Sequence, residues 1–159
     1  MKIIQSPLEL KENLNKLENI FLIPTMGNLH EGHISLIKEA KKLSDNIILT
    51  IFINPIQFNS INDLESYPRS LSQDIDILKE TDVSILFNPS ADDIYPINSN
   101  LSYKMPIISN ELCGKNRINH FKGVITVVDR LFKLIKPSYA IFGKKDYQQL
   151  YLIKKFIGY

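Results

Sequence analysis

Residues 24–33 read Pro24-Thr25-Met26-Gly27-Asn28-Leu29-His30-Glu31-Gly32-His33, and this stretch decides the fold. The apolar run before it, residues 20–23, is typical of a buried strand, and residues 34–40 have the apolar spacing of a helix. Pro24 is expected to end the strand, because proline cannot donate a hydrogen bond to a sheet ladder. The stretch therefore predicts a strand, a turn with two glycines and a helix start.

The same turn has the features of a phosphate site. Gly27 and Gly32 allow the backbone to approach a ligand closely. The helix start offers N–H groups and the positive end of its dipole. His30 and His33 are three residues apart, so they project to one side of the first helical turn. These features together indicate a site for developing negative charge.

Metal ligation and a purely structural use of the two histidines are alternatives. Zinc proteases place two histidines four residues apart on a formed helix, and that spacing is absent here. The chain has three histidines and one cysteine, which makes a closed zinc site hard to assemble. Phosphate binding is therefore the favoured interpretation.

Outside this turn, the apolar pattern alternates between strands and helices. The predicted strands cover residues 20–23, 46–53, 84–87 and 139–142. The predicted helices cover residues 7–18, with Ser6 as N-cap, and residues 33–43, 70–79, 126–135, with an alternative start near Phe121, and 147–157. Residues 54–69 and 88–103 are predicted as long loops, with a turn at 98–100. This order favours an α/β fold, a doubly wound parallel sheet with helices on both faces.

Composition sets the class of protein. A chain of 159 residues with 44% hydrophobic residues is expected to form one domain. Its net charge of +2, without a basic stripe, argues against nucleic-acid binding. Cys113 is the only cysteine, which fits a reducing compartment. We find no signal peptide and no apolar run of membrane-spanning length, so the sequence predicts a cytoplasmic protein without membrane contact.

Polar residues gather just after the predicted strands, where ligands bind in open α/β sheets. These residues are His30, His33, Asn54, Gln57, Lys145, Asp146 and Gln149. The sequence therefore predicts a binding site along one edge of the sheet.

Four motifs resemble one family, and together they extend over most of the chain. They are residues 24–33, Ile51-Phe52-Ile53-Asn54-Pro55-Ile56-Gln57-Phe58, Tyr67-Pro68-Arg69, and Phe142-Gly143-Lys144-Lys145-Asp146-Tyr147-Gln148-Gln149. In this order and spacing they resemble the pantothenate synthetase (pantoate–β-alanine ligase) family, of the nucleotidyltransferase superfamily with the His-Ile-Gly-His motif. The resemblance implies a Rossmann-like domain that converts ATP and pantoate to pantoyl adenylate and pyrophosphate. β-Alanine then attacks the adenylate to give pantothenate and AMP.

The resemblance also implies roles for individual residues. His33, His30 and Lys145 would be catalytic. Pantoate would contact Gln57 and Gln149, with β-alanine also near Gln57. Mg²⁺ would arrive with ATP, without a metal site made by the protein. ATP would bind Met26, Gly27, Asn28, Leu29, His30, Glu31, Gly32, His33, Gly143, Lys144, Lys145 and Asp146.

The chain departs from the family pattern at several places. Lys144 stands where the family has Glu, and Ile118-Asn119 replaces Pro-Gly, which leaves the roles of Arg117 and His120 open. Family members continue into a small C-terminal domain with a Ser-Ser-Arg-Asn segment, which does not occur in these 159 residues. The expectation is a homodimer that binds substrates with impaired catalysis. Another nucleotidyltransferase of the superfamily, or a non-catalytic nucleotide-binding or dimerisation module, are the alternatives.

Overall fold

Five apolar segments pair as one parallel sheet in the order β1-β4-β3-β2-β5. The computed structural model describes residues 1–96, 103–117 and 119–157 of the chain. The strands are β1 (Lys2–Ile4), β2 (Phe21–Thr25), β3 (Ile47–Ile51), β4 (Ile85–Phe87) and β5 (Tyr139–Ala140). All five residues of β3 are buried, as expected for a central parallel strand covered on both faces.

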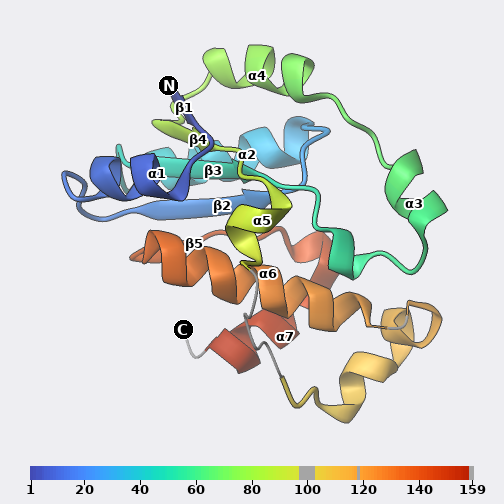
Figure 1. The fold of residues 1–159 in the computed structure, drawn as a ribbon. Helices are drawn as coiled ribbons and strands as arrows, with labels where there is room; N and C mark the ends of the chain where they lie inside the picture. The colour runs from blue at the N-terminus through green and yellow to red at the C-terminus, as the bar shows by residue number, and fades with distance from the viewer. Residues whose placement is uncertain (97–102, 118, 158–159) are drawn as a thin grey trace.

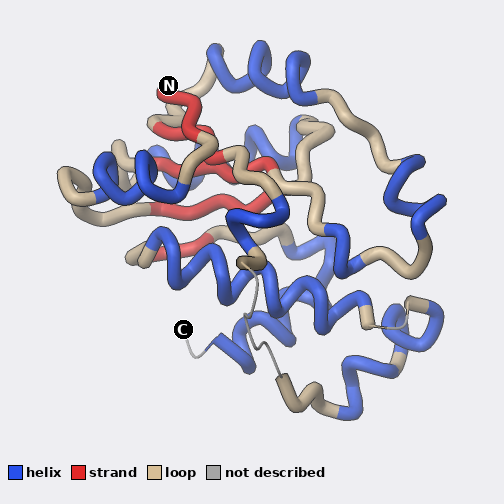
Figure 2. Tube along the Cα trace, in the orientation of Figure 1, coloured by secondary structure: helices blue, strands red, loops and turns tan. Residues whose placement is uncertain are grey.

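Helices cover both faces of the sheet, so the predicted α/β class is confirmed (Figure 1). One face packs against α1 (Pro7–Leu14), α5 (Ala91–Ile94), α6 (His120–Ile135) and α7 (Tyr147–Ile157). The other face packs against α2 (Glu31–Lys41) and α4 (Leu71–Lys79). Figure 2 shows the resulting three layers, with the strands between the helices. The fold is Rossmann-like.

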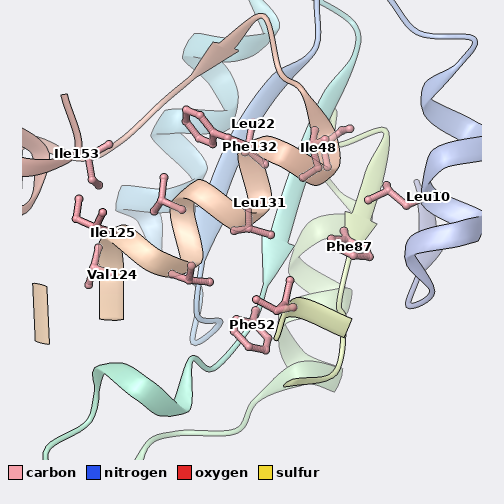
Figure 3. Packing of buried hydrophobic residues seen from close by; sticks show 14 of the residues in the cluster. Leu10, Leu22, Ile48, Phe52, Phe87, Val124, Ile125, Leu131, Phe132 and Ile153 are labelled. Carbon is pink, nitrogen blue, oxygen red and sulfur yellow. The ribbon is translucent and has the colours of Figure 1, made fainter. Parts of the chain in front are cut away.

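The larger core lies between the sheet and α6. Leu22, Ile48 and Phe87 project from the sheet toward Leu131 of the helix, and Ile125 lies on the side of the helix next to Ile153 of α7 (Figure 3). Eleven of the sixteen residues of α6 are buried. A helix that is apolar around most of its circumference is buried on several sides, and here the sheet, α1 and α7 surround it.

The expectation that Pro24 ends its strand is wrong. Pro24 lies inside β2 and is paired in register with Thr50 of β3. Successive residues of a parallel strand direct their N–H and C=O groups to opposite neighbours. The Leu22 carbonyl accepts from the Ile141 N–H on the β5 side, so Pro24, two residues on, faces the same side. Proline therefore ends the pairing with β5 but leaves the pairing with β3 intact.

Other boundaries also differ from the sequence predictions. The first helix ends at Leu14 rather than near residue 18, although Leu17 still packs on the core. The two predicted long loops contain short helices: η1 (Pro55–Gln57) and α3 (Ile61–Ser66) in the first, and α5 in the second. Two further short helices, η2 (Ile107–Asn110) and η3 (Leu112–Asn116), precede α6. Residues 98–100 and Ile118, for which the sequence also made predictions, lie outside the described residues.

The strand order reverses beside β2. The chain runs from β2 to β3 to β4 in one direction and then returns to β5 on the other side of β2. In open α/β sheets, ligands bind beyond the carboxyl ends of the strands at the point where the order reverses. Residues 26–33 follow β2, and η4 (Lys144–Asp146) follows β5. The two predicted ATP-binding segments therefore flank this reversal point.

Candidate active site at the carboxyl edge of the sheet

His30 and His33 close the start of α2 with their own rings. His30 is the N-cap, so the helix begins at Glu31 rather than at His33. The Gly32 N–H donates to His30 Nδ1 at 3.0 Å, and the His30 N–H donates to His33 Nδ1 at 3.3 Å. A neutral imidazole that accepts at Nδ1 carries its proton on Nε2. Each ring therefore keeps one Nε2–H donor, and the ring centroids are 4.3 Å apart.

These hydrogen bonds change the expected role of the helix start. The sequence predicts that the N–H groups at the helix start are free for a ligand, but the Gly32 N–H donates to the His30 ring. A Cβ at residue 32 would lie 2.8 Å from His30 Cε1, so glycine makes room for that ring. The donors that remain on the two rings are their Nε2–H groups.

The surroundings of His33 favour the neutral form of its imidazole. Burial lowers the pKa of its imidazole, and the neighbouring His30 and Lys145 lower it further, while Asp74 partly opposes them. A neutral ring with its proton on Nε2 can donate a hydrogen bond to a phosphate oxygen without losing a bound counter-ion first. Lys145, on the segment after β5, makes the smallest of these contributions to the pKa of His33.

Gln57 is held by a buried chain of side-chain amides. Asn54, which is fully buried, donates through Nδ2 to the Gly123 carbonyl at 3.0 Å and to Gln57 Oε1 at 3.1 Å. The Tyr95 hydroxyl donates to Asn54 Oδ1 at 2.8 Å. Because a backbone carbonyl can only accept, Gly123 fixes the orientation of both amides. Gln57 Nε2 then points toward Met26 Sδ, 2.8 Å away, and a thioether is a weak acceptor.

The segment after β5 contributes the remaining predicted residues. Lys145 and Asp146 are exposed on η4, and Lys144 is exposed beside them. Gln149 lies in the first turn of α7 and is partly buried. Gly143 has a φ of −67°, and a Cβ there would meet nothing within 4 Å. Without a ligand, the backbone at residue 143 therefore does not require glycine.

A cavity of about 540 Å³ opens beside Met26 at the ends of β2, β3 and β4. Its volume falls in the range of small-molecule sites. The residues between α3 and α4 form its far wall, with Arg69 among them. The lining is Met26, Ile51, Phe52, Ile53, Pro55, Leu64, Pro68, Arg69, Ser70, Leu71, Asp74, Asn88, Pro89 and Ala91.

The contacts of Asn54 and Asp74 do not follow from the sequence. Asn54 is predicted at the binding edge from its position after a strand, but its hydrogen bond is to a carbonyl 69 residues further along the chain. Asp74 is 2% exposed and accepts hydrogen bonds from the Asn28 and Leu29 N–H groups. A signal was present for Asp74, because it falls on the inward face of its helix between Leu71 and Leu78. A charged residue on an apolar face marks a buried polar contact.

Within the described ranges, no group of three or more His, Cys, Asp or Glu side chains comes together as a metal site. Among the same residues, none of the helices has both the length and the apolar character needed to cross a membrane. Cys113 is exposed. The location of Mg²⁺ stays a prediction.

His120 and His33 make stability depend on pH. Burial lowers the pKa of both rings, and the His120 Nδ1–H donates to the Gln57 carbonyl at 3.1 Å. A lowered pKa means that the unfolded chain binds the proton more readily, so stability falls as the pH drops below about 6.5. We expect a lower free energy of unfolding at pH 5.5 than at pH 7.5 in urea titrations. The His120→Gln variant, whose amide can still donate to residue 57, should lose less over that range. An equal loss in both proteins would contradict this account.

Comparisons with known proteins match nearly the whole chain to one family. A family profile described as "Pantoate-beta-alanine ligase" matches residues 2–158. Pantothenate synthetase from Neisseria meningitidis serogroup C is 46% identical over 155 residues, which are 97% of this chain and 56% of that protein. The enzyme of that name from Francisella tularensis subsp. novicida is 49% identical over 149 residues, or 93% of this chain and 57% of that protein. The chain thus spans somewhat more than half the length of these relatives.

Solved structures agree in fold. Pantoate-beta-alanine ligase from Francisella tularensis, complexed with beta-gamma ATP and beta-alanine, has a TM-score of 0.95 and 46% identity. The match covers 99% of this chain and 62% of that one. Pantothenate synthetase from Thermus thermophilus has a TM-score of 0.91 and 35% identity, covering 99% and 57% respectively. A family match over residues 2–158, on a sheet and motif loop of this geometry, shows that the chain belongs to the pantoate–β-alanine ligase family.

Proposed function

We propose that this chain binds ATP and pantoate and takes part in their conversion to pantoyl adenylate, the first half of pantothenate synthesis. A carboxylate oxygen of pantoate would attack the α-phosphorus of ATP, and the bond to the β-phosphate would break to release pyrophosphate. The amine of β-alanine would then attack the acyl carbon and release AMP. The attacking groups belong to the substrates, so positioning and charge stabilisation are what the protein must supply.

The paired imidazoles carry this proposal. His30 and His33 each accept a backbone N–H at Nδ1 and keep an Nε2–H donor at the reversal point of the sheet. Preorganised donors of this kind stabilise charge that builds up on phosphate oxygens in a transition state. Lys145, which acts electrostatically on His33, would pair with a phosphate. Asp146 would accept from ribose hydroxyls or hold Mg²⁺ through water.

Gln57 supports the assignment of pantoate to the neighbouring space. Its Oε1 is bonded to Asn54, so its Nε2–H₂ is the end available to a ligand. A carboxylate or hydroxyl oxygen is a far better acceptor than the Met26 thioether and would replace it. Gln149 would provide the second pantoate contact, and β-alanine would bind near Gln57. As part of the same proposal, residues 1–159 form one nucleotide- and pantoate-binding domain of a cytoplasmic homodimer.

Detection of pantoyl adenylate tests the proposal directly. The chain is incubated with ATP, Mg²⁺ and pantoate, and the adenylate is measured by mass spectrometry, with and without the C-terminal domain of a relative supplied in trans. We expect adenylate in the complemented reaction and much less in the chain alone. Ligation by the chain alone at ordinary enzyme rates, about 1–10³ per second, would contradict the expected impairment.

Calorimetry separates the alternatives. Heat from ATP and then from pantoate supports the proposed substrates. Heat from ATP alone, with adenylyl transfer to a different acceptor, would favour another nucleotidyltransferase. No heat from either ligand would favour a non-catalytic module.

A further inference from the structure

Asp74 holds the loop that carries the two histidines. It lies on α4, and its side chain is 2% exposed. One carboxylate oxygen accepts from the Asn28 N–H at 2.9 Å and from the Ser70 hydroxyl at 3.0 Å, and the other accepts from the Leu29 N–H at 2.7 Å. Two of these donors belong to the loop and the third, Ser70, is the N-cap residue of α4. The carboxylate therefore fixes the loop against α4, because hydrogen bonds to a charged group are about twice as strong as neutral ones.

The loop is shaped around this carboxylate. Gly27 and Asn28 both have left-handed backbones, with φ values of +83° and +53°. A Cβ at residue 27 would lie 2.9 Å from Asp74 Oδ2, so only glycine leaves room for the carboxylate there. The turn sends two successive N–H groups toward α4. These two groups are therefore not available to a phosphate.

We propose that Asp74 is a positioning residue. Its carboxylate accepts hydrogen bonds from the Asn28 and Leu29 N–H groups, and it thereby fixes the positions of His30 and His33 relative to the nucleotide. The part that concerns the nucleotide rests on the proposed function, whereas the part that concerns the loop does not. In this arrangement a nucleotide phosphate meets imidazole N–H donors, while the loop amides face the protein. This differs from a P-loop, in which backbone N–H groups cradle the phosphates.

The Asp74→Asn variant tests the acceptor role with almost no change in size. A carboxylate only accepts, whereas an amide presents one oxygen and one NH₂ group. In the variant, the NH₂ group would face either the Asn28 or the Leu29 N–H, and one of these donors would lose its partner. The Asp76→Asn variant is the matched control, since it removes an exposed charge from the same helix, paired only with Lys79 in the described contacts.

The NMR chemical shifts of the backbone amide protons report on the hydrogen bonds of the loop in the absence of any ligand. We expect the Asn28 and Leu29 amide protons to lie downfield in the parent chain and to move upfield in Asp74→Asn, but not in Asp76→Asn. Ser70→Ala, which deletes one donor to the carboxylate, should move the same two signals by a smaller amount. A folded Asp74→Asn protein with unmoved signals overturns the proposal. If Asp74→Asn does not fold, Ser70→Ala decides by the same criterion.

Calorimetry with ATP and, separately, with pantoate then tests the consequence for the site. Asp74→Asn should weaken ATP binding about 10- to 100-fold, the range that corresponds to one charge-assisted hydrogen bond, and change pantoate binding less than about threefold. An equal loss for both ligands would indicate general destabilisation and count against a positioning role. A parent chain that does not bind ATP would refute the proposed function, while the amide signals would still decide the role of Asp74 in the loop.

Discussion

Replacing His33 with alanine is expected to lower the rate of pantoyl adenylate formation by about 10²–10³-fold, the usual cost of losing one preorganised donor to a transition-state oxyanion. The ring supplies two contacts at once. Its Nδ1 accepts the His30 N–H, which fixes both the ring and its neighbour, and under the proposed function its Nε2–H would donate to the nucleotide. Alanine removes the donor and also frees His30, whose ring centroid lies 4.3 Å away.

Single-turnover adenylate formation, measured by quench and mass spectrometry in the complemented reaction, gives this rate. The His33→Gln variant is the matched comparison. Its Oε1 can accept the His30 N–H and its Nε2 can donate, so glutamine reproduces both contacts of the neutral imidazole. We expect His33→Gln to retain clearly more activity than His33→Ala. A His33→Ala rate close to that of the parent chain would remove the imidazole pair from the mechanism.

Apolar periodicity depends only on residues that are close in sequence. The sequence therefore predicts the order of strands and helices along the chain. Residues 47–51 and 147–157 have the expected structures, with shifts of one or two residues at strand ends. The order of strands across the sheet is not contained in that periodicity, since it depends on which apolar faces pack together. β1, with three residues, is too short to show a period at all.

The sequence predicts that the candidate site residues follow neighbouring strand ends, but it does not predict their hydrogen bonds. The residues after β2 and β5 lie at one edge, as expected when parallel strands end together. The expectation that the N–H groups at the helix start are open to a ligand is wrong for Gly32. The His30 ring, two residues earlier in the chain, accepts the hydrogen bond of that N–H group. Contacts such as Asp74 to Leu29 and Asn54 to Gly123 join distant parts of the chain, and a single sequence does not reveal such pairs.

Gly123 connects the core helix to the proposed pantoate contact, and its replacement by alanine is the second large effect that we expect. α6 and η1 touch here: a Cβ at residue 123 would lie 2.7 Å from both Gln57 Cα and the Ile56 carbonyl oxygen. Atoms cannot approach so closely, so the η1 backbone must move by several tenths of an ångström. The Gly123 carbonyl also anchors Asn54, so the same movement disturbs the amide orientation of Gln57.

Gly123→Ala should therefore lower the free energy of unfolding by about 1–3 kcal/mol, as overpacking of a core does, and weaken pantoate binding about tenfold or more. The sign of the change in the free energy of unfolding is diagnostic, because alanine in place of glycine inside a helix otherwise stabilises the protein by about 0.5–1 kcal/mol. Gly143→Ala is the stability control, since its Cβ would meet nothing within 4 Å and its φ is −67°. Urea titration should find that control within about 0.5 kcal/mol of the parent chain. A Gly123→Ala protein that is more stable than the parent and binds pantoate equally well would show that α6 can move away from η1 without consequence, and the amide chain would then not position Gln57.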